Sequence, residues 1–188
     1  MEALLGIFSA FGLSASAGLN AYIPLLVVAL MARFTDLITL NGPWDTLTSW
    51  WIIGLLIILS AIEFLVDKFP VINHINDMIV QSFVRPAAGA LVFAASTNII
   101  TDVHPVLALA LGLLVAGSVH ATKTIAVRPV VTAATGTTGN IPVSMAEDVT
   151  STTLSVLSIV VPAVVGVILI ALVSWMIWFL FLRSSQTE

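Results

Sequence analysis

Five long stretches of this sequence contain no Asp, Glu, Lys or Arg, and this feature limits the possible folds most. A helix needs about 20 apolar residues to cross the hydrocarbon core of a bilayer. Soluble domains carry about a quarter charged residues, whereas 9% of this chain is charged and 59% is hydrophobic. We therefore expect one all-α, polytopic integral membrane domain over residues 1–188. The stretches are Ala3–Ala32, Thr46–Ile62, Pro86–Thr101, Pro105–Thr122 and Thr152–Leu182.

The first and last stretches are too long for one straight span, and each contains a proline that can interrupt a helix. Proline removes a helical hydrogen bond and clashes with the preceding turn. We expect breaks near Pro24, which follows the run Ser14–Asn20, and near Pro162. The third stretch is short enough to be tilted or re-entrant. The sequence thus predicts four to six membrane segments, at least one of them discontinuous or re-entrant.

Polar stretches separate the apolar ones, and two of them carry a pattern. Residues 67–85 have apolar side chains at helical spacing, which is typical of a helix lying along the membrane interface. The run Gly136–Pro142, within 123–148, is rich in glycine and threonine and predicts a loop or re-entrant turn. Val84-Arg85-Pro86 recurs as Val127-Arg128-Pro129, and this echo raises the possibility of an internal repeat.

Charged residues next to the apolar stretches are the first candidates for function, because ionisable groups near a membrane core are costly unless paired or wetted. Glu63 and Asp67 are four apart and share a helix face if the helix continues, with Lys68 directly after them. The alternative is a helix end whose charges reach the lipid headgroups.

The fourth stretch ends in a basic group made of His120, Lys123 and Arg128. These residues could carry protons or bind an anion, or they could serve as a basic anchor at the interface. Glu147 and Asp148 either pair with Arg85 or Arg128 beside a polar cavity or cap a helix N-terminus.

Two asparagines lie beside the expected breaks. Asn20 needs a hydrogen-bond partner inside hydrocarbon, and Asn140 follows Gly139 in the glycine-rich run. We expect both to line an unwound region beside the path that a transported solute or ion would take.

The sequence also argues against several classes of protein. It has no cysteine and three dispersed histidines, so we expect no conventional metal site and no cofactor. It lacks the common catalytic and nucleotide-binding motifs, so we do not expect an enzyme. Its 6 Lys and Arg form no basic stripe, which argues against nucleic acid as a partner.

Several short motifs together resemble the bacterial membrane family known as domain of unknown function 4126. They are Ser14–Pro24, the Glu63…Asp67-Lys68-Phe69-Pro70 run, Val84-Arg85-Pro86, and Gly139-Asn140-Ile141-Pro142 with Glu147-Asp148. The resemblance spans almost the whole chain. It implies a multi-helix domain of the bacterial inner (plasma) membrane, and it supplies no substrate or site residues.

The expected function is a transporter or channel for a small solute or ion, built as a homo-oligomer in the lipid bilayer. In this hypothesis Glu63 and Asp67 handle cations or protons, and Arg85 and Arg128 attract anions. The alternative is a membrane scaffold or lipid-binding protein that transports nothing.

Overall fold

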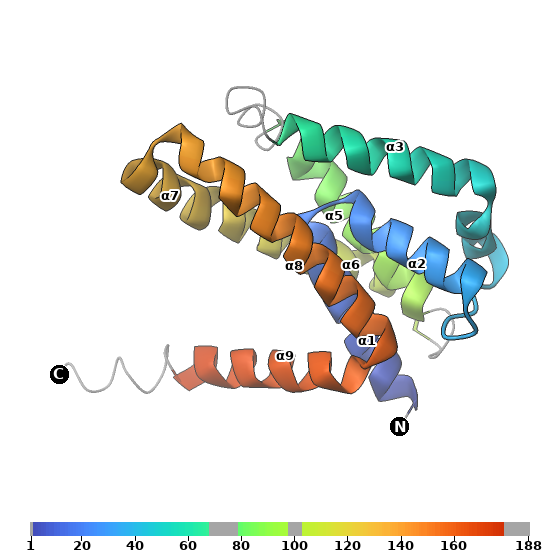
Figure 1. Ribbon diagram of the computed structural model, residues 1–188. Helices are drawn as coiled ribbons and strands as arrows, with labels where there is room; N and C mark the ends of the chain where they lie inside the picture. Colours follow the sequence, from blue (N-terminus) through green and yellow to red (C-terminus); the bar gives the residue numbers. More distant parts are fainter. Residues whose placement is uncertain (1, 68–78, 98–102, 179–188) are drawn as a thin grey trace.

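The structure, a computed structural model, describes residues 2–67, 79–97 and 103–178, and every regular element in these ranges is helical (Figure 1). This confirms the all-α prediction for the described part of the chain. The elements are α1 (Glu2–Leu19), α2 (Tyr22–Phe34), η1 (Gly42–Thr48), α3 (Trp50–Val66), α5 (Gln81–Thr97), α6 (Pro105–Thr122), η3 (Lys123–Val127), α7 (Arg128–Thr135), η4 (Thr137–Gly139), α8 (Asn140–Val160) and α9 (Pro162–Ile177).

Helix α1 is the centre of the fold, in contact with α2, α5, α6, α8 and α9. Its small side chains let these neighbours approach closely and bond to it. The Ser14 hydroxyl donates to the carbonyl oxygen of Gly112 on α6 at 2.8 Å, and the Ser16 hydroxyl donates to that of Ser151 on α8 at 2.8 Å. Leu13 and Ala17 are fully buried between these contacts.

Both predicted helix breaks are confirmed. The first apolar stretch divides at Asn20 into α1 and α2, and Pro24 falls in the first turn of α2, where proline is tolerated. The last stretch divides at Val161, and α9 leaves α8 at an angle of 117° with Pro162 as its first residue. Figure 1 shows α9 running away from the body of the protein.

Because polar residues follow Thr122, the sequence predicted that the fourth helix ends there. In the structure the helix continues past Thr122. Helix α6 runs through the π-helical turn η3 into α7, forming one helix of 31 residues over Pro105–Thr135. A π turn changes the local hydrogen-bonding register, and here it comes just before Pro129, which lacks an N–H to donate. The helix stops only at Gly136, whose φ of 72° suits glycine.

The helical surface is strongly apolar. Pro105–Thr135 is long and apolar enough to cross a membrane, and the two bent pairs η1–α3 and α8–α9 pass the same test if each is one span. Large exposed apolar patches are rare on water-soluble monomers, so this surface fits contact with lipid. The exposed large apolar side chains of α3 and α9 include Trp50, Trp51, Ile58, Leu65, Val167, Ile170, Leu172 and Trp175.

The interface helix predicted over 67–85 lies largely outside the described residues. Its described end, from Gln81, is the first turn of α5. Gln81 and Arg85 are buried inside the protein there, and Phe83 on the same turn is exposed.

Helices α5 and α6 cross at two glycines, and this crossing gives a stability prediction. A Cβ on Gly89 would lie 2.8 Å from the Gly112 carbonyl oxygen and 2.9 Å from the Ser14 hydroxyl. Gly89→Ala should therefore lower the thermal unfolding temperature in detergent, since overpacking costs about 1–3 kcal/mol.

The matched control is Gly54→Ala on α3, where a Cβ would meet no atom within 4 Å. This change should leave stability unchanged or raise it by about 0.5–1 kcal/mol, because alanine favours a helix over glycine. Equal effects of the two substitutions would contradict the close crossing of α5 and α6.

Candidate functional site

The break between α1 and α2 lies inside the protein and exposes backbone groups that helices normally satisfy internally. Helix ends leave unpaired N–H and C=O groups, and hydrocarbon offers no water to bond them. The buried side chain of Asn20 forms hydrogen bonds with two of these backbone groups. Its Oδ1 accepts from the backbone N–H groups of Tyr22 and Ile23, both at 3.1 Å, and its Nδ2 donates to Asp148 on α8 at 3.0 Å.

Charged side chains form hydrogen bonds with other backbone groups at the break. The sign of each charge is opposite to the partial charge of the helix end that it contacts. Arg85 donates to the carbonyl oxygen of Gly18, and Lys123 donates to that of Leu19, each at 3.4 Å. Across the break, the N–H of Ala21 donates to the carboxylate of Glu63 at 3.2 Å. Cations thus lie at the negative end of α1 and an anion at the positive end of α2.

Arg85 holds two carboxylates in a group that we name the Arg85 triad: Glu63, Asp67 and Arg85. The guanidinium lies 2.9 Å from the Glu63 Oε1 and 3.7 Å from the Asp67 Oδ2. All three side chains are at most 2% exposed. The predicted common face of Glu63 and Asp67 is confirmed, but it points into the protein and not towards headgroups. Asp67 also accepts a hydrogen bond from Ser144 on α8 at 3.1 Å.

Glu147 joins two cations in a second group, the Glu147 triad: Lys123, Arg128 and Glu147. One oxygen, Oε2, lies 2.8 Å from the Lys123 Nζ and 2.9 Å from the Arg128 Nη2. The predicted pairing of Glu147 with Arg128 is confirmed. The capping alternative is wrong, because α8 begins at Asn140, two turns before Glu147.

The structure brings together most of the charged and amide residues that the sequence marked. Asn140 is an exception, since it lies at the start of α8 and donates to the Thr132 hydroxyl on α7 at 2.8 Å. His120 is buried on α6 one turn before Lys123, and its carbonyl oxygen accepts from the Thr124 hydroxyl. Lys68 lies outside the described residues. The residues at the break and in the two triads are Asn20, Glu63, Asp67, Arg85, Lys123, Arg128, Glu147 and Asp148.

The two Arg-Pro dipeptides each contain a buried arginine, but they lie in different helical contexts. The π turn η3 directly precedes Arg128, whereas Arg85 and Pro86 lie inside the α-helix α5. In each case the arginine is buried and forms an ion pair with an acid on another helix. The sequence echo therefore corresponds to a shared pairing of a buried arginine with an acid on another helix.

Sequence reasoning missed the backbone carbonyls of α1 and a line of serines on α8. Ser151 and Ser155 both lie within hydrogen-bond distance of the Ser16 hydroxyl, at 2.8 and 2.7 Å. The sequence does contain a pattern that indicates this line of serines. The buried polar residues of α8 recur at intervals of three and four, which places them on one helix face. They are Ser144, Glu147, Ser151, Ser155 and Ser158.

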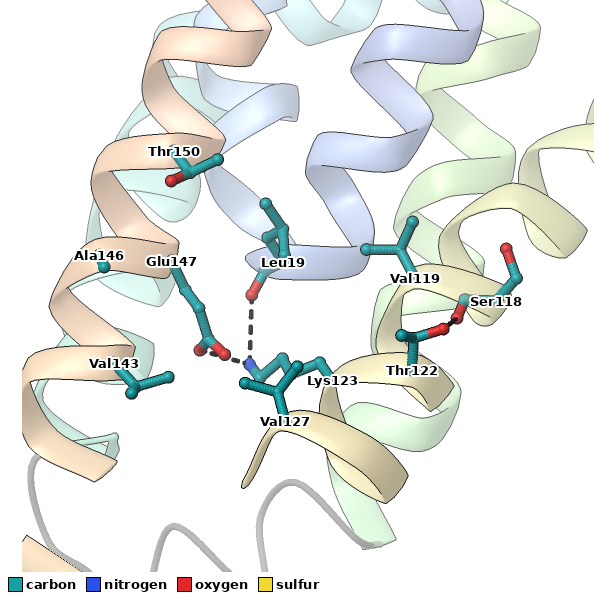
Figure 2. A pocket seen from close by; sticks show the side chains of 10 residues that line it. All are labelled: Leu19, Ser118, Val119, Thr122, Lys123, Val127, Val143, Ala146, Glu147 and Thr150. Carbon is teal, nitrogen blue, oxygen red and sulfur yellow. Dashed lines mark hydrogen bonds and ion pairs between the residues drawn. The ribbon is translucent and has the colours of Figure 1, made fainter. Parts of the chain in front are cut away.

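A pocket of about 460 Å³ is lined in part by Lys123 and Glu147, two members of the Glu147 triad. Because α1 ends at Leu19, the space beyond it, between α6–η3 and α8, is left open. Figure 2 shows the Lys123 Nζ between the Glu147 carboxylate and the Leu19 carbonyl oxygen. In the described ranges no three His, Asp or Glu side chains are arranged to hold a metal ion.

The Arg85 triad gives a second stability prediction. Arg85→Gln would leave two buried carboxylates without their cation, and breaking a buried ion pair costs about 3–5 kcal/mol. We expect a large drop in the thermal unfolding temperature in detergent.

Arg33→Gln is the matched control, because the Arg33 guanidinium is exposed and stacks 4.1 Å from the centre of the Trp50 ring. Such a contact is worth about 0.5–1 kcal/mol. If both variants unfolded at the same temperature, the Arg85 triad would not hold the helix break together.

Comparison with known proteins identifies a family but no function. No curated protein and no solved structure matches the chain. The model of the family described as domain of unknown function (DUF4126) matches residues 7–181. The match covers nearly all of the 188 residues and agrees with the resemblance of the motifs. The chain belongs to the DUF4126 family.

Proposed function

We propose that this protein is a transporter or channel that moves a small solute or ion across the bacterial inner membrane. In this proposal the α1–α2 break is the central binding region. The chain crosses the membrane with four to six segments, of which the bent pairs form discontinuous spans. The proposal does not include catalysis.

One observation carries the proposal: a discontinuous helix whose two ends meet buried charges from other helices. Transporters bind their cargo at such breaks, where half-helix ends present dipoles and bare backbone groups. Charges within a membrane domain are expensive and are kept mainly for function. Here Glu63, Arg85 and Lys123 all contact the backbone at the break.

The pocket supports a carrier more than a continuous pore. It reaches the Glu147 triad from the side on which α1 has ended. On the opposite side α1 fills the gap between α6 and α8, and Ser16 bonds directly to Ser151 and Ser155. Access from that side would require α1 and α8 to separate, as alternating access demands.

A homo-oligomer is part of the proposal. Beyond Gly166, the described side chains of α9 are partly or fully exposed, and the helix extends away from the body. A second copy packed along α9 would help to enclose a path that one small protomer cannot enclose alone.

The second candidate is a scaffold or lipid-binding protein, and a specific observation favours it. Each of the six charged side chains in the two triads has an opposite charge within 4 Å. A network satisfied in this way also serves as structural support for a broken helix. The two candidates differ in whether water reaches the break.

The first experiment is flux into liposomes that contain the purified protein, with panels of cations, protons and small anions. Transport should exceed that of empty liposomes and fall at least about tenfold in Glu63→Gln, equivalent to a loss of about 1.4 kcal/mol. Asp36→Asn makes the same acid-to-amide change at an exposed position and should keep full flux. Folded protein that moves no member of the panel, or equal flux in both variants, would refute the proposal.

Cysteine labelling separates the two candidates, because the chain has no native cysteine. Thr122→Cys and Thr150→Cys lie on the pocket wall and should react with a membrane-impermeant maleimide. Leu114→Cys on the apolar outer face of α6 should stay protected by lipid. Protection of all three positions would favour the scaffold.

A further inference from the structure

Most of the wall of the pocket beside the break is apolar (Figure 2). Its volume of about 460 Å³ falls within the ordinary range for small-molecule sites, so the apolar part of a small ligand can be buried there. The apolar side chains of the lining are Leu19, Val119, Val127, Val143 and Ala146, and the polar ones are Ser118, Thr122, Lys123, Glu147 and Thr150.

The charges of the lining cancel. Lys123 and Glu147 are the two charged residues that line the pocket, and the Lys123 Nζ lies 2.8 Å from the Glu147 Oε2. Their charges sum to zero, so a charged ligand would bring a charge without a counter-charge into a mainly apolar site. Burying such a charge is costly. The lining therefore favours an uncharged ligand.

The hydroxyl groups of α6 in the lining are acceptors towards a ligand. The Ser118 hydroxyl donates to the Val115 carbonyl oxygen, and the Thr122 hydroxyl donates to the Ser118 carbonyl oxygen, both at 2.8 Å. A hydroxyl group has one proton to donate and two lone pairs. These two oxygens can therefore still accept a hydrogen bond, whereas their protons are already used.

Glu147 supplies the strongest acceptor of the lining. Its ion pairs with Lys123 and Arg128 both use Oε2. Among the described residues no group donates to the Glu147 Oε1, and the side chain keeps 10% of its surface exposed. A hydrogen bond to a carboxylate is roughly twice as strong as one between neutral groups. A ligand that donates a hydrogen bond is therefore favoured.

We infer that this pocket binds an uncharged molecule that has an apolar chain and a hydroxyl group. The hydroxyl donates to the Glu147 Oε1, and the chain lies along the valines of α6, η3 and α8. This binding goes beyond the proposed transport function and does not depend on it. The same chemistry has two sources, a small alcohol dissolved in water and a monoglyceride of the bilayer.

Ligands of the same shape but different chemistry fit less well. A carboxylate would lie against the Glu147 carboxylate, and the Lys123 ammonium already donates to the Leu19 carbonyl oxygen and pairs with Glu147. An ammonium could donate to Glu147, but it would lie beside Lys123 in a lining that has no second acid. An ether has no proton to donate and would leave the Glu147 Oε1 without a partner.

The test uses the full chain in nanodiscs and an octanol that carries a photoreactive diazirine in its chain. After irradiation, mass spectrometry should find label within residues 118–127 or 143–150, and unlabelled octanol should compete. Heptyl methyl ether, an isomer of octanol without a donor, should compete at least about tenfold more weakly, as should octanoate and octylammonium. Competition by the ether or by either ion that equals that of octanol would overturn the inference.

A second competition series distinguishes the two sources of the ligand. It compares hexanol with monooleoylglycerol. Stronger competition by hexanol identifies an alcohol that arrives from water, and stronger competition by monooleoylglycerol identifies a lipid of the bilayer. If neither compound competed, the assignment of an alcohol site would be wrong.

The position of the site is tested by filling the pocket from its exposed wall. Ala146→Phe should lower the labelling that octanol displaces at least about fivefold, because the new ring occupies the space of the chain. This change leaves both ion pairs of Glu147 in place. Val149→Phe, exposed on α8 outside the lining, is the matched control and should keep the labelling. Equal labelling in the two variants would contradict the site.

The role of Glu147 is tested by Glu147→Gln. The amide oxygen should remain with Lys123 and Arg128, which places the NH₂ group, a donor, where Oε1 now accepts. The preference for octanol over heptyl methyl ether should therefore disappear, a change that a purely structural role for Glu147 does not produce. An unchanged preference in folded Glu147→Gln would overturn the assignment.

The outcomes separate this inference from the transport proposal. Octanol binding without flux of any ion or small solute keeps the pocket assignment and refutes transport. Flux of ions in a protein whose pocket shows no labelling that octanol displaces overturns the pocket assignment and keeps transport.

Discussion

The whole arrangement depends on the need to satisfy the backbone where α1 ends and α2 begins. Hydrocarbon cannot bond the free C=O and N–H groups at Gly18–Tyr22, so side chains from the surrounding helices must do so. Arg85 comes from α5, Lys123 from the continuous α6–α7 helix and Glu63 from α3. Each charge then needs a counter-charge in a low-dielectric interior, and the two triads supply it. Side chains from α3, α5, α6 and α8 therefore converge on the α1–α2 break.

One face of helix α8 contacts the Arg85 triad, the two cations of the Glu147 triad and the break. Ser144 bonds to the Arg85 triad, Glu147 to Lys123 and Arg128, and Asp148 to Asn20 at the break. A shift of α8 would change all these contacts at once. Packed interfaces of this kind tend to have discrete alternatives instead of deforming gradually. This property makes α8 the natural moving element of the proposed carrier.

The sequence predicted the features that depend on local chemistry. Apolar length and proline position indicated helices with breaks at Asn20 and before Pro162, and four-residue spacing placed Glu63 and Asp67 on one face. It could not predict that the helix continues past Lys123, because a π turn accommodates Pro129 there. It also misjudged Glu147, since a capping box looks the same whether a helix begins at Ser144 or, as here, at Asn140. Partners such as the Leu19 carbonyl depend on tertiary packing.

The two Arg-Pro elements place their arginines in different surroundings. Both present a buried arginine to an acid on another helix. Arg85 pairs with two acids, and all three side chains of the Arg85 triad are at most 2% exposed. Arg128 shares its acid with Lys123, and this triad borders the space that α1 leaves open by ending at Leu19. Both triads thus support the backbone at the end of α1, Arg85 through the carbonyl oxygen of Gly18 and Lys123 through that of Leu19.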